Sequence, residues 1–324
     1  MKQNFYTNNK NGGLMKKFQI LGLMLVILLI SSCGKGGSSD KVKLQLKLEK
    51  GKTYEYLVAM QQAITTEFQG KEQKMQQSMQ FGYNFKVEDI STDSITTLSC
   101  TYTSVKFDMD MVGNSSHYDS KDSGSSDDIM SKVMGGFVNK SFKMKISPQM
   151  RVLEISGMSE IISSFFDSVD VPEFTKNTIK EQFSKQYGDE AIKESFQTSF
   201  MMFPDKPVGV GDSWNETIEL TKSFPIKINI SYTVKERKDG KMTIALKSEI
   251  ETNKETSKTD IGNAQMEYKM SGTQDGSIVV DEATGWIVNS KINQKINGTM
   301  VITGEGQTLE TPLNIDGTIT VESK

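Results

Sequence analysis

The chain has 324 residues, with 38 lysines and arginines against 41 acidic residues, one histidine and two cysteines. This slightly acidic balance argues against a nucleic-acid partner, because proteins bind nucleic acids through clustered positive charge. A single histidine and two cysteines are a poor supply of ligands for a zinc centre, which takes three or four. The sequence implies no cofactor and no metal site.

The N-terminal region has the layout of a secretory signal peptide. Two lysines precede an apolar run, Phe18 to Ile30, which ends at small residues and Cys33. The run is shorter than the roughly 20 apolar residues that a membrane-spanning helix needs. We therefore expect residues 1–32 to be a signal peptide, with Met15 as the true start of translation.

The end of this run, Ile30-Ser31-Ser32-Cys33, resembles the lipobox of bacterial lipoproteins. The resemblance implies cleavage between Ser32 and Cys33 and lipidation of Cys33. Acyl chains hold a protein to a membrane through the burial of methylenes, each worth about 0.8 kcal/mol. Residues 33–40 then form a flexible tether. Glycine rather than aspartate after the cysteine favours the outer membrane, with the protein on its periplasmic face or at the cell surface.

The remaining residues, 41–324, are dominated by patterns typical of β-strands. Residues 41–50 alternate apolar with polar side chains, which indicates a half-buried strand. Further strands are predicted at residues 53–66, 79–87, 95–111, 142–146, 152–155, 216–220, 226–235, 242–250, 265–270, 276–280, 285–296, 300–303 and 313–321. A change of apolar phase between Tyr102 and Val105 predicts a β-bulge. The polar segments 68–77, 113–128 and 251–262 are predicted to be turns or loops.

Helices are predicted between two groups of strands. Residues 127–138 repeat apolar side chains every four positions, and residues 158–202 continue the helical spacing. Gly188 is expected to break the second region, and Asp189 is expected to cap the helix that follows. The expected fold class is α+β: mainly antiparallel β, as a curved sheet or half-barrel, with a helical insertion between residues 127 and 202.

Three short segments recur in the same order along the chain. Lys50–Tyr54 is similar to Val210–Trp214, Asn84–Val87 to Ser231–Val234, and Lys145–Val152 to Val279–Trp286. The recurrence predicts two similar halves, residues 41–157 and 203–324, with the helices between them. A chance similarity between β-rich segments is the alternative.

Some of the same segments carry a family resemblance. The signal, the opening before Tyr54, the segment Phe203–Trp214 and the hairpin Asp281–Trp286 resemble a family of envelope lipoproteins of Bacteroidota-type bacteria. The domain of that family has no known function. The resemblance spans residues 41–324 and implies a β-rich envelope lipoprotein. It brings no catalytic residues.

Side chains suited to catalysis are few. His117 lies in the polar segment 113–128, where a solvated surface is the simplest interpretation. Cys100 lies in an apolar strand, as core cysteines do. Asp212-Ser213 and Asp281-Glu282 lie in turns, where such residues bind backbone groups. We assign no catalytic residue.

Apolar side chains instead point to binding. Methionine and aromatic residues at helical spacing form either a core face against the sheet or a groove for an apolar ligand. The predicted groove residues are Met130, Val133, Met134, Phe137, Phe183, Phe196 and Phe200.

The expected function is that of a membrane-anchored, non-catalytic lipoprotein of the bacterial cell envelope. Its expected partners are the membrane, through lipidated Cys33, and a lipid or other apolar ligand. The first alternative is a structural component that docks on another envelope protein. The second alternative is a hydrolase.

Overall fold

The computed structural model describes residues 41–68, 70–111, 114–122, 134–167, 173–221, 225–254, 257–261, 264–304 and 306–324. The unit Lys41–Lys324, which we call the body, contains all described core residues, from Leu44 to Val321. A unit with its own core is expected to fold without the residues that precede it.

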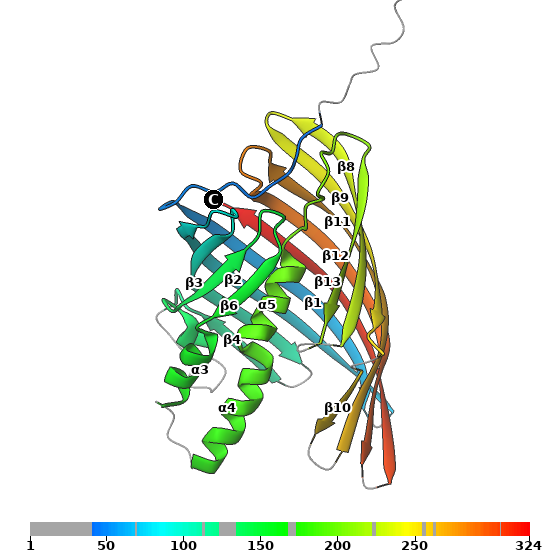
Figure 1. The fold of residues 1–324 in the computed structure, drawn as a ribbon. Coiled ribbons are helices and arrows are strands. Elements are labelled where there is room, and N and C mark those ends of the chain that lie inside the picture. The colour runs from blue at the N-terminus through cyan, green and yellow to red at the C-terminus, as the bar shows by residue number, and fades with distance from the viewer. Residues whose placement is uncertain are drawn as a thin grey trace, which may run out of the picture. The chain divides into compact units, whose positions relative to one another are not determined.

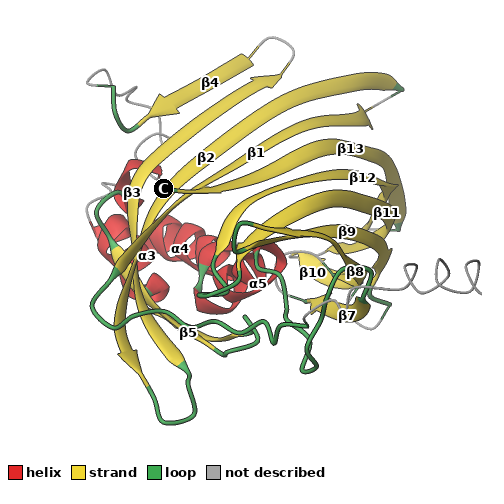
Figure 2. Cartoon of the chain, turned by 90° about the horizontal axis from the view of Figure 1, so that it is seen from above, coloured by secondary structure: helices red, strands yellow, loops and turns green. Residues whose placement is uncertain are grey.

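An antiparallel sheet of 13 strands forms most of the body (Figure 1). The strands are β1 (Thr53–Phe68), β2 (Lys71–Ile90), β3 (Thr96–Met111), β4 (Asn114–Asp119), β5 (Ser141–Ile146), β6 (Val152–Ser156), β7 (Ser213–Leu220), β8 (Ile226–Lys238), β9 (Lys241–Thr252), β10 (Lys258–Ile261), β11 (Ala264–Asp281), β12 (Ile287–Gly304) and β13 (Gln307–Ser323). Neighbours follow the order β6-β5-β3-β2-β1-β13-β12-β11-β9-β8-β7, with β4 beside β3 and β10 beside β11. The sheet curves without closing (Figure 2). The predicted fold class is confirmed.

Three helices follow β6 and precede β7: α3 (Met158–Asp167), α4 (Glu173–Tyr187) and α5 (Asp189–Ser199). They lie on the concave side of the sheet (Figure 2), and α5 contacts the edge strands β6 and β7. Helix α4 packs on α3 and α5. Residues 134–137 form one more helical turn, and residues 123–133 lie outside the described part. None of the described helices has the length and apolar character needed to cross a membrane.

The segment of residues 41–50 crosses one end of the sheet in an extended conformation, and we call it the N-terminal strap. Its predicted alternation is correct, because Leu44, Leu46 and Leu48 are buried. The prediction of a sheet strand is wrong. Leu46 N donates to Pro148 O and Lys47 N donates to Thr284 O, both at 2.8 Å. The strap is therefore held by the β5–β6 and β11–β12 turns, which belong to distant parts of the sheet.

The two edge strands are linked at this same end, which we call the strap end. Arg151, just before β6, donates from its guanidinium to the Glu216 carboxylate of β7 at 2.8 Å. Phe203 N donates to Gln149 O at 3.0 Å. Side-chain and loop contacts thus join the edges here without strand pairing. The opposite end, which contains the β1–β2 and β12–β13 turns, is called the distal end.

Three segments predicted as turns or loops contain strands. Residues 71–77 belong to β2, whose pairing with β1 continues to the pair Phe68 and Lys71. Asn114–Asp119 forms β4, where His117 faces Asp108 and bonds to it through Nδ1. Lys258–Ile261 forms β10. Backbone pairing extends these strands past the core, and their polar side chains, largely solvated there, do not oppose it.

In two places, two separately predicted strands belong to one long strand, because the strand continues past its apolar residues. Residues 265–270 and 276–280 are parts of the single strand β11, and 285–296 and 300–303 fall mostly within β12. Gly272, Gly276 and Gly298 interrupt the apolar pattern in these strands. A Cβ at Gly272 would lie 2.4 Å from Lys295 O, so the glycine allows the close approach of neighbouring strands where the sheet curves.

Two local predictions have clear outcomes. The bulge between Tyr102 and Val105 is confirmed, because Tyr102 pairs with Tyr83 and Ser104 with Gly82, which leaves Thr103 unpaired. The predicted cap by Asp189 is wrong for its own helix, since Gly188 is the N-cap of α5. Asp189 instead accepts a hydrogen bond from Met158 N at the start of α3, at 2.8 Å.

The same backbone bonds recur in the two predicted halves. Gly51 N donates to Val87 O, and Gly211 N donates to Val234 O, both at 2.9 Å. Both glycines have positive φ, +86° and +91°. The register of the sheet shifts immediately after Val87 and again immediately after Val234. These recurrences support the proposal of an internal duplication, which stays a prediction.

Candidate ligand-binding surface

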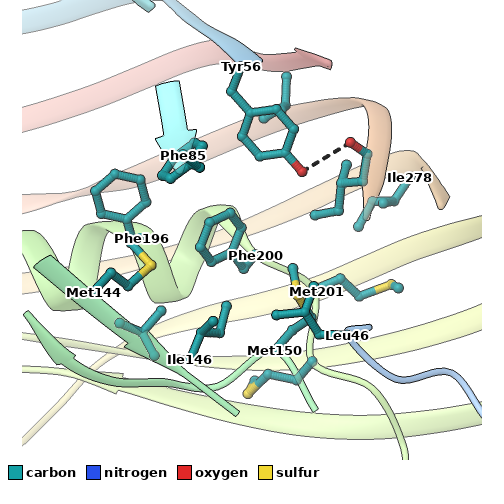
Figure 3. Close-up of a cluster of buried hydrophobic side chains, with 14 of the residues drawn as sticks. Leu46, Tyr56, Phe85, Met144, Ile146, Met150, Phe196, Phe200, Met201 and Ile278 are labelled. Carbon is teal, nitrogen blue, oxygen red and sulfur yellow. Dashed lines mark hydrogen bonds between the residues drawn. The ribbon is translucent and has the colours of Figure 1, made fainter. Parts of the chain in front are cut away.

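The strap end is filled by an aromatic core (Figure 3). Phe85 of β2 is fully buried, with its ring centroid 5.4 Å from that of Tyr56 and 5.8 Å from that of Trp286. The rings of Phe196 on α5 and of Phe200, the C-cap of α5, lie 6.0 and 6.5 Å from that of Phe85. These two residues, assigned from the sequence to a ligand groove, therefore pack in the core.

Titratable groups in this core are held neutral. The Tyr56 hydroxyl donates to Ile287 O at 3.0 Å (Figure 3), and burial raises its pKa well above the ordinary value. Burial also raises the pKa of the Cys100 thiol, so a reactive thiolate is disfavoured. In the described part of the chain, no three His, Cys, Asp or Glu side chains are grouped to hold a metal ion.

Three other predicted groove residues, Met134, Phe137 and Phe183, are described by the structure. Phe137 and Phe183 stack with ring centroids 6.3 Å apart, and Met134 is buried. A cavity of about 10 Å³, near the volume that one water needs, is lined by Gly136, Phe137, Ile161, Ile162, Phe165 and Phe183. Met130 and Val133 lie outside the described residues. The structure thus brings Phe137 and Phe183 together, and both belong to or pack against the core cluster that contains Phe196 and Phe200. The groove stays a prediction.

A larger hollow, of about 440 Å³, has a polar lining. It is bordered by Gln61, Gln62, Ala63, Gln76, Thr273, Asp275, Asn293, Gln294, Lys295, Asp316, Gly317 and Thr318. Side chains alternate between the two faces of a strand, and most of these residues alternate with the buried ones. The hollow therefore belongs mainly to the outer face of the sheet.

The inner face of the sheet is the face that Tyr56 shares with α5, since its ring lies 6.4 Å from Phe200. Paired residues on neighbouring strands point to the same face. Following the register from β3 to β7 gives one continuous row, which we call the isoleucine row. Its members are Met111, Met75, Ile64, Ile315, Ile296, Gly272, Ile250, Ile228 and Ile218.

The isoleucine row is covered at one side only. Ile250 and Ile228 are 3% and 4% exposed, whereas Ile64, Ile296 and Ile315 are only half-buried. Helix α5, the helix that contacts the sheet most, lies beside the edge strands, and α4 packs on other helices. Apolar side chains from β1, β12 and β13 therefore face the concave side with part of their surface exposed. Such a surface on a folded protein commonly marks a binding site.

Charge is almost excluded from the same region. Within four consecutive inner-face rows, from that of Met60 to that of Thr66, the charged residue is Glu216, which pairs with Arg151 at the β7 edge. The outer face of the same strands carries Lys295 and Asp316, among other charges. The inner face thus suits an uncharged, largely apolar ligand.

Fold and surface together define an open antiparallel half-barrel with a partly exposed apolar inner face. The chain matches a Family of unknown function (DUF6263) over residues 93–287, which is more than half of its length, and it belongs to this family. No curated protein matches the sequence.

Several solved structures are similar at low identity. Lipovitellin, from a structure of its lipid–protein interactions, shares 10% identity with a TM-score of 0.48, over 86% of this chain and 25% of that chain. OccK7 (OpdD) of Pseudomonas aeruginosa shares 5% with a TM-score of 0.24, over 85% and 99%. The translocator domain of the autotransporter NalP from Neisseria meningitidis shares 8% with a TM-score of 0.18, over 94% and 97%. The chain spans about a quarter of the lipovitellin chain.

Proposed function

We propose that this protein is a lipid-anchored component of the bacterial cell envelope, bound to the outer membrane through Cys33. We propose that its body binds the acyl chain of a lipid on the isoleucine row and has no catalytic role. The observation that carries the proposal is the half-buried, uncharged part of that row on β2, β1, β13 and β12.

The dimensions of the row suit an acyl chain. Strands are spaced by about 4.8 Å, so the six strands from β3 to β11, whose members of the row keep exposed surface, span about 24 Å, the scale of an extended long acyl chain. Covering apolar surface contributes about 25 cal/mol for each Å² removed from water. Methionine at the β2 and β3 end of the row supplies flexible side chains that adapt to different chains.

The anchor accounts for access to lipids. A lipidated Cys33 followed by a short tether keeps the body within reach of the membrane surface. We expect Cys33→Ala to abolish incorporation of labelled palmitate and to release the protein from membranes into the soluble or secreted fraction. Membrane fractionation of cells making the parent or the variant measures this. An unchanged membrane fraction for the variant would contradict the anchor.

Binding is tested with the body from Lys41 and the probe N-phenyl-1-naphthylamine, which fluoresces in apolar surroundings. Ile296→Asp places a charge in the half-buried part of the isoleucine row and is expected to weaken probe binding about tenfold or more. Asn297→Asp, the next residue of β12 and exposed on the outer face, is the matched control and is expected to bind like the parent.

Native mass spectrometry of the body purified from its own cell envelope gives a second readout. A bound lipid near one-to-one stoichiometry, lost in Ile296→Asp but kept in Asn297→Asp, is the expected result. If the parent binds neither a lipid nor the probe, the ligand proposal is overturned. The alternative, in which the body docks on another envelope protein, would then be favoured.

A further inference from the structure

A second inner-face row crosses the sheet one step nearer to the strap end, and we call it the glutamine row. Its members are Met109, Gln77, Gln62, Gly317, Gln294, Gln274, Ser248, Ile230 and Glu216. Successive rows on one face lie about 7 Å apart along the strands. The rows on both sides are apolar, so the glutamines form a polar line within an apolar surface.

The glutamine row is only partly satisfied by the protein itself. The Ser248 hydroxyl donates to Gln274 Oε1 at 2.9 Å, and Gln274 Nε2 donates to Gln294 Oε1 at 3.3 Å. On β2, Gln77 Nε2 reaches the Met79 sulfur at 3.2 Å, which is a weak acceptor. Side chains of the row are therefore hydrogen-bonded to one another at the β9 to β12 side, whereas at the β2 side the acceptor is a methionine sulfur.

Gln62 is the least satisfied member. Among the residues that the structure describes, no protein group forms a hydrogen bond with the Gln62 side chain, which is half-buried. Its neighbour in the row is Gly317, where a Cβ would lie 3.1 Å from Gln62 Cγ and 3.2 Å from Gln294 Nε2. The two amides therefore converge over a position without a side chain. Gln294 is 8% exposed and Gln62 is half-buried, so a small polar group of a ligand would meet Gln62 first, with Gln294 Nε2 beside it.

The chemistry of such a group follows from the donors and acceptors present. Amides supply both N–H donors and a carbonyl acceptor, and they carry no charge. Among the strand residues that the structure describes, Glu216, at the far edge of the row, is the charged side chain on the inner face near them, so an ionised headgroup would enter without a counter-charge, which is costly. An uncharged carbonyl, with or without a hydroxyl beside it, is complementary to this surface.

We propose that Gln62 and Gln294 bind the neutral ester or amide group of an acyl lipid whose chain lies on the isoleucine row. This inference rests on the proposed function and adds the chemical class of the ligand: a chain joined to an uncharged polar group, as in a monoacylglycerol, rather than a fatty acid anion. The polar group sits one row nearer to the strap end than the chain.

Displacement of N-phenyl-1-naphthylamine from the body by 1-monooleoylglycerol or by oleate at pH 8 tests the proposal. Because the double variant Gln62→Leu with Gln294→Leu removes two hydrogen bonds to the polar group, it is expected to weaken monooleoylglycerol binding by about tenfold. Probe binding is expected to stay within about twofold of the parent, because the chain surface is unchanged. Gln61→Leu, on the outer face of β1, is the matched control.

The outcomes separate the two proposals. If the parent binds the probe and prefers monooleoylglycerol to oleate, and only the double variant loses that preference, the glutamine row is the polar site. If the probe binds but the double variant retains full affinity for monooleoylglycerol, the polar site is wrong while the proposed function stands. If the parent binds neither the probe nor a lipid from its own envelope, the proposed function fails and this inference fails with it. Near-ultraviolet circular dichroism of each variant checks that the fold is retained.

Discussion

Replacing Phe85 with alanine is expected to lower the free energy of unfolding of the body by about 3–5 kcal/mol. The side chain is fully buried and makes ring contacts with β1, with α5 and with the residue before β12, through Tyr56, Phe196 and Trp286. Its removal leaves a cavity at the place where the sheet, the helices and the strap-end turns meet, so no single element can move to fill it.

Urea unfolding, followed by the fluorescence of the tryptophans, measures this change. Phe174→Ala is the matched control, because Phe174 lies on α4 with 84% of its surface exposed, and its loss is expected to cost under about 0.5 kcal/mol. Similar costs for the two variants would show that the aromatic core does not hold the helices to the sheet.

Gly285→Ala is expected to cost about 3 kcal/mol, from two sources. The residue has φ +70°, which disfavours a side chain, and a Cβ there would lie 2.3 Å from Gln45 O in the strap. Gly240→Ala isolates the first source, because Gly240 has φ +71° and no atom within 4 Å of the added Cβ. That control is expected to cost about 1–2 kcal/mol.

The difference between the two glycine variants measures the contact between the strap and the β11–β12 turn. Urea unfolding of both in the same body gives that difference directly. Equal costs would mean that the strap yields without loss of stability, and would contradict its role in joining distant turns at the strap end.

Local sequence patterns predicted the parts of the fold that depend on neighbours in the chain. The phase change between Tyr102 and Val105 indicates a bulge because it is visible within a single strand. The break at Gly188 is equally local, and the structure places the boundary between α4 and α5 there. Alternation in residues 41–50 predicted which leucines are buried. It could not predict that the segment lies outside the sheet, since an extended segment has the same period whether or not it pairs with a strand.

The candidate surface could not be predicted from local patterns, because it depends on which strands pair. Within β12, the alternation of Ile292, Gln294 and Ile296 with polar residues is readable, and it indicates an inner face. The isoleucine and glutamine rows exist only because β13 lies between β12 and β1, a pairing of residues more than 200 positions apart in sequence. The groove was predicted from the helical aromatic residues instead, because their spacing is visible in a single segment. Two of them, Phe196 and Phe200, lie in the core.

The strand order has a consequence for how the protein is made. Read across the sheet from β7, the paired strands follow the chain to β13 and then continue with β1. The first and last strands thus pair in the interior of the sheet, where Lys324 N donates to Glu55 O. Until the last 17-residue strand emerges from the ribosome, β1 and β12 each present an unpaired edge. The sheet can be completed only after β13 has been made, and pairing over such a sequence distance is slow. Until then the edges of β1 and β12 are open to pairing with strands of other chains, and the arrival of β13 removes both edges at once.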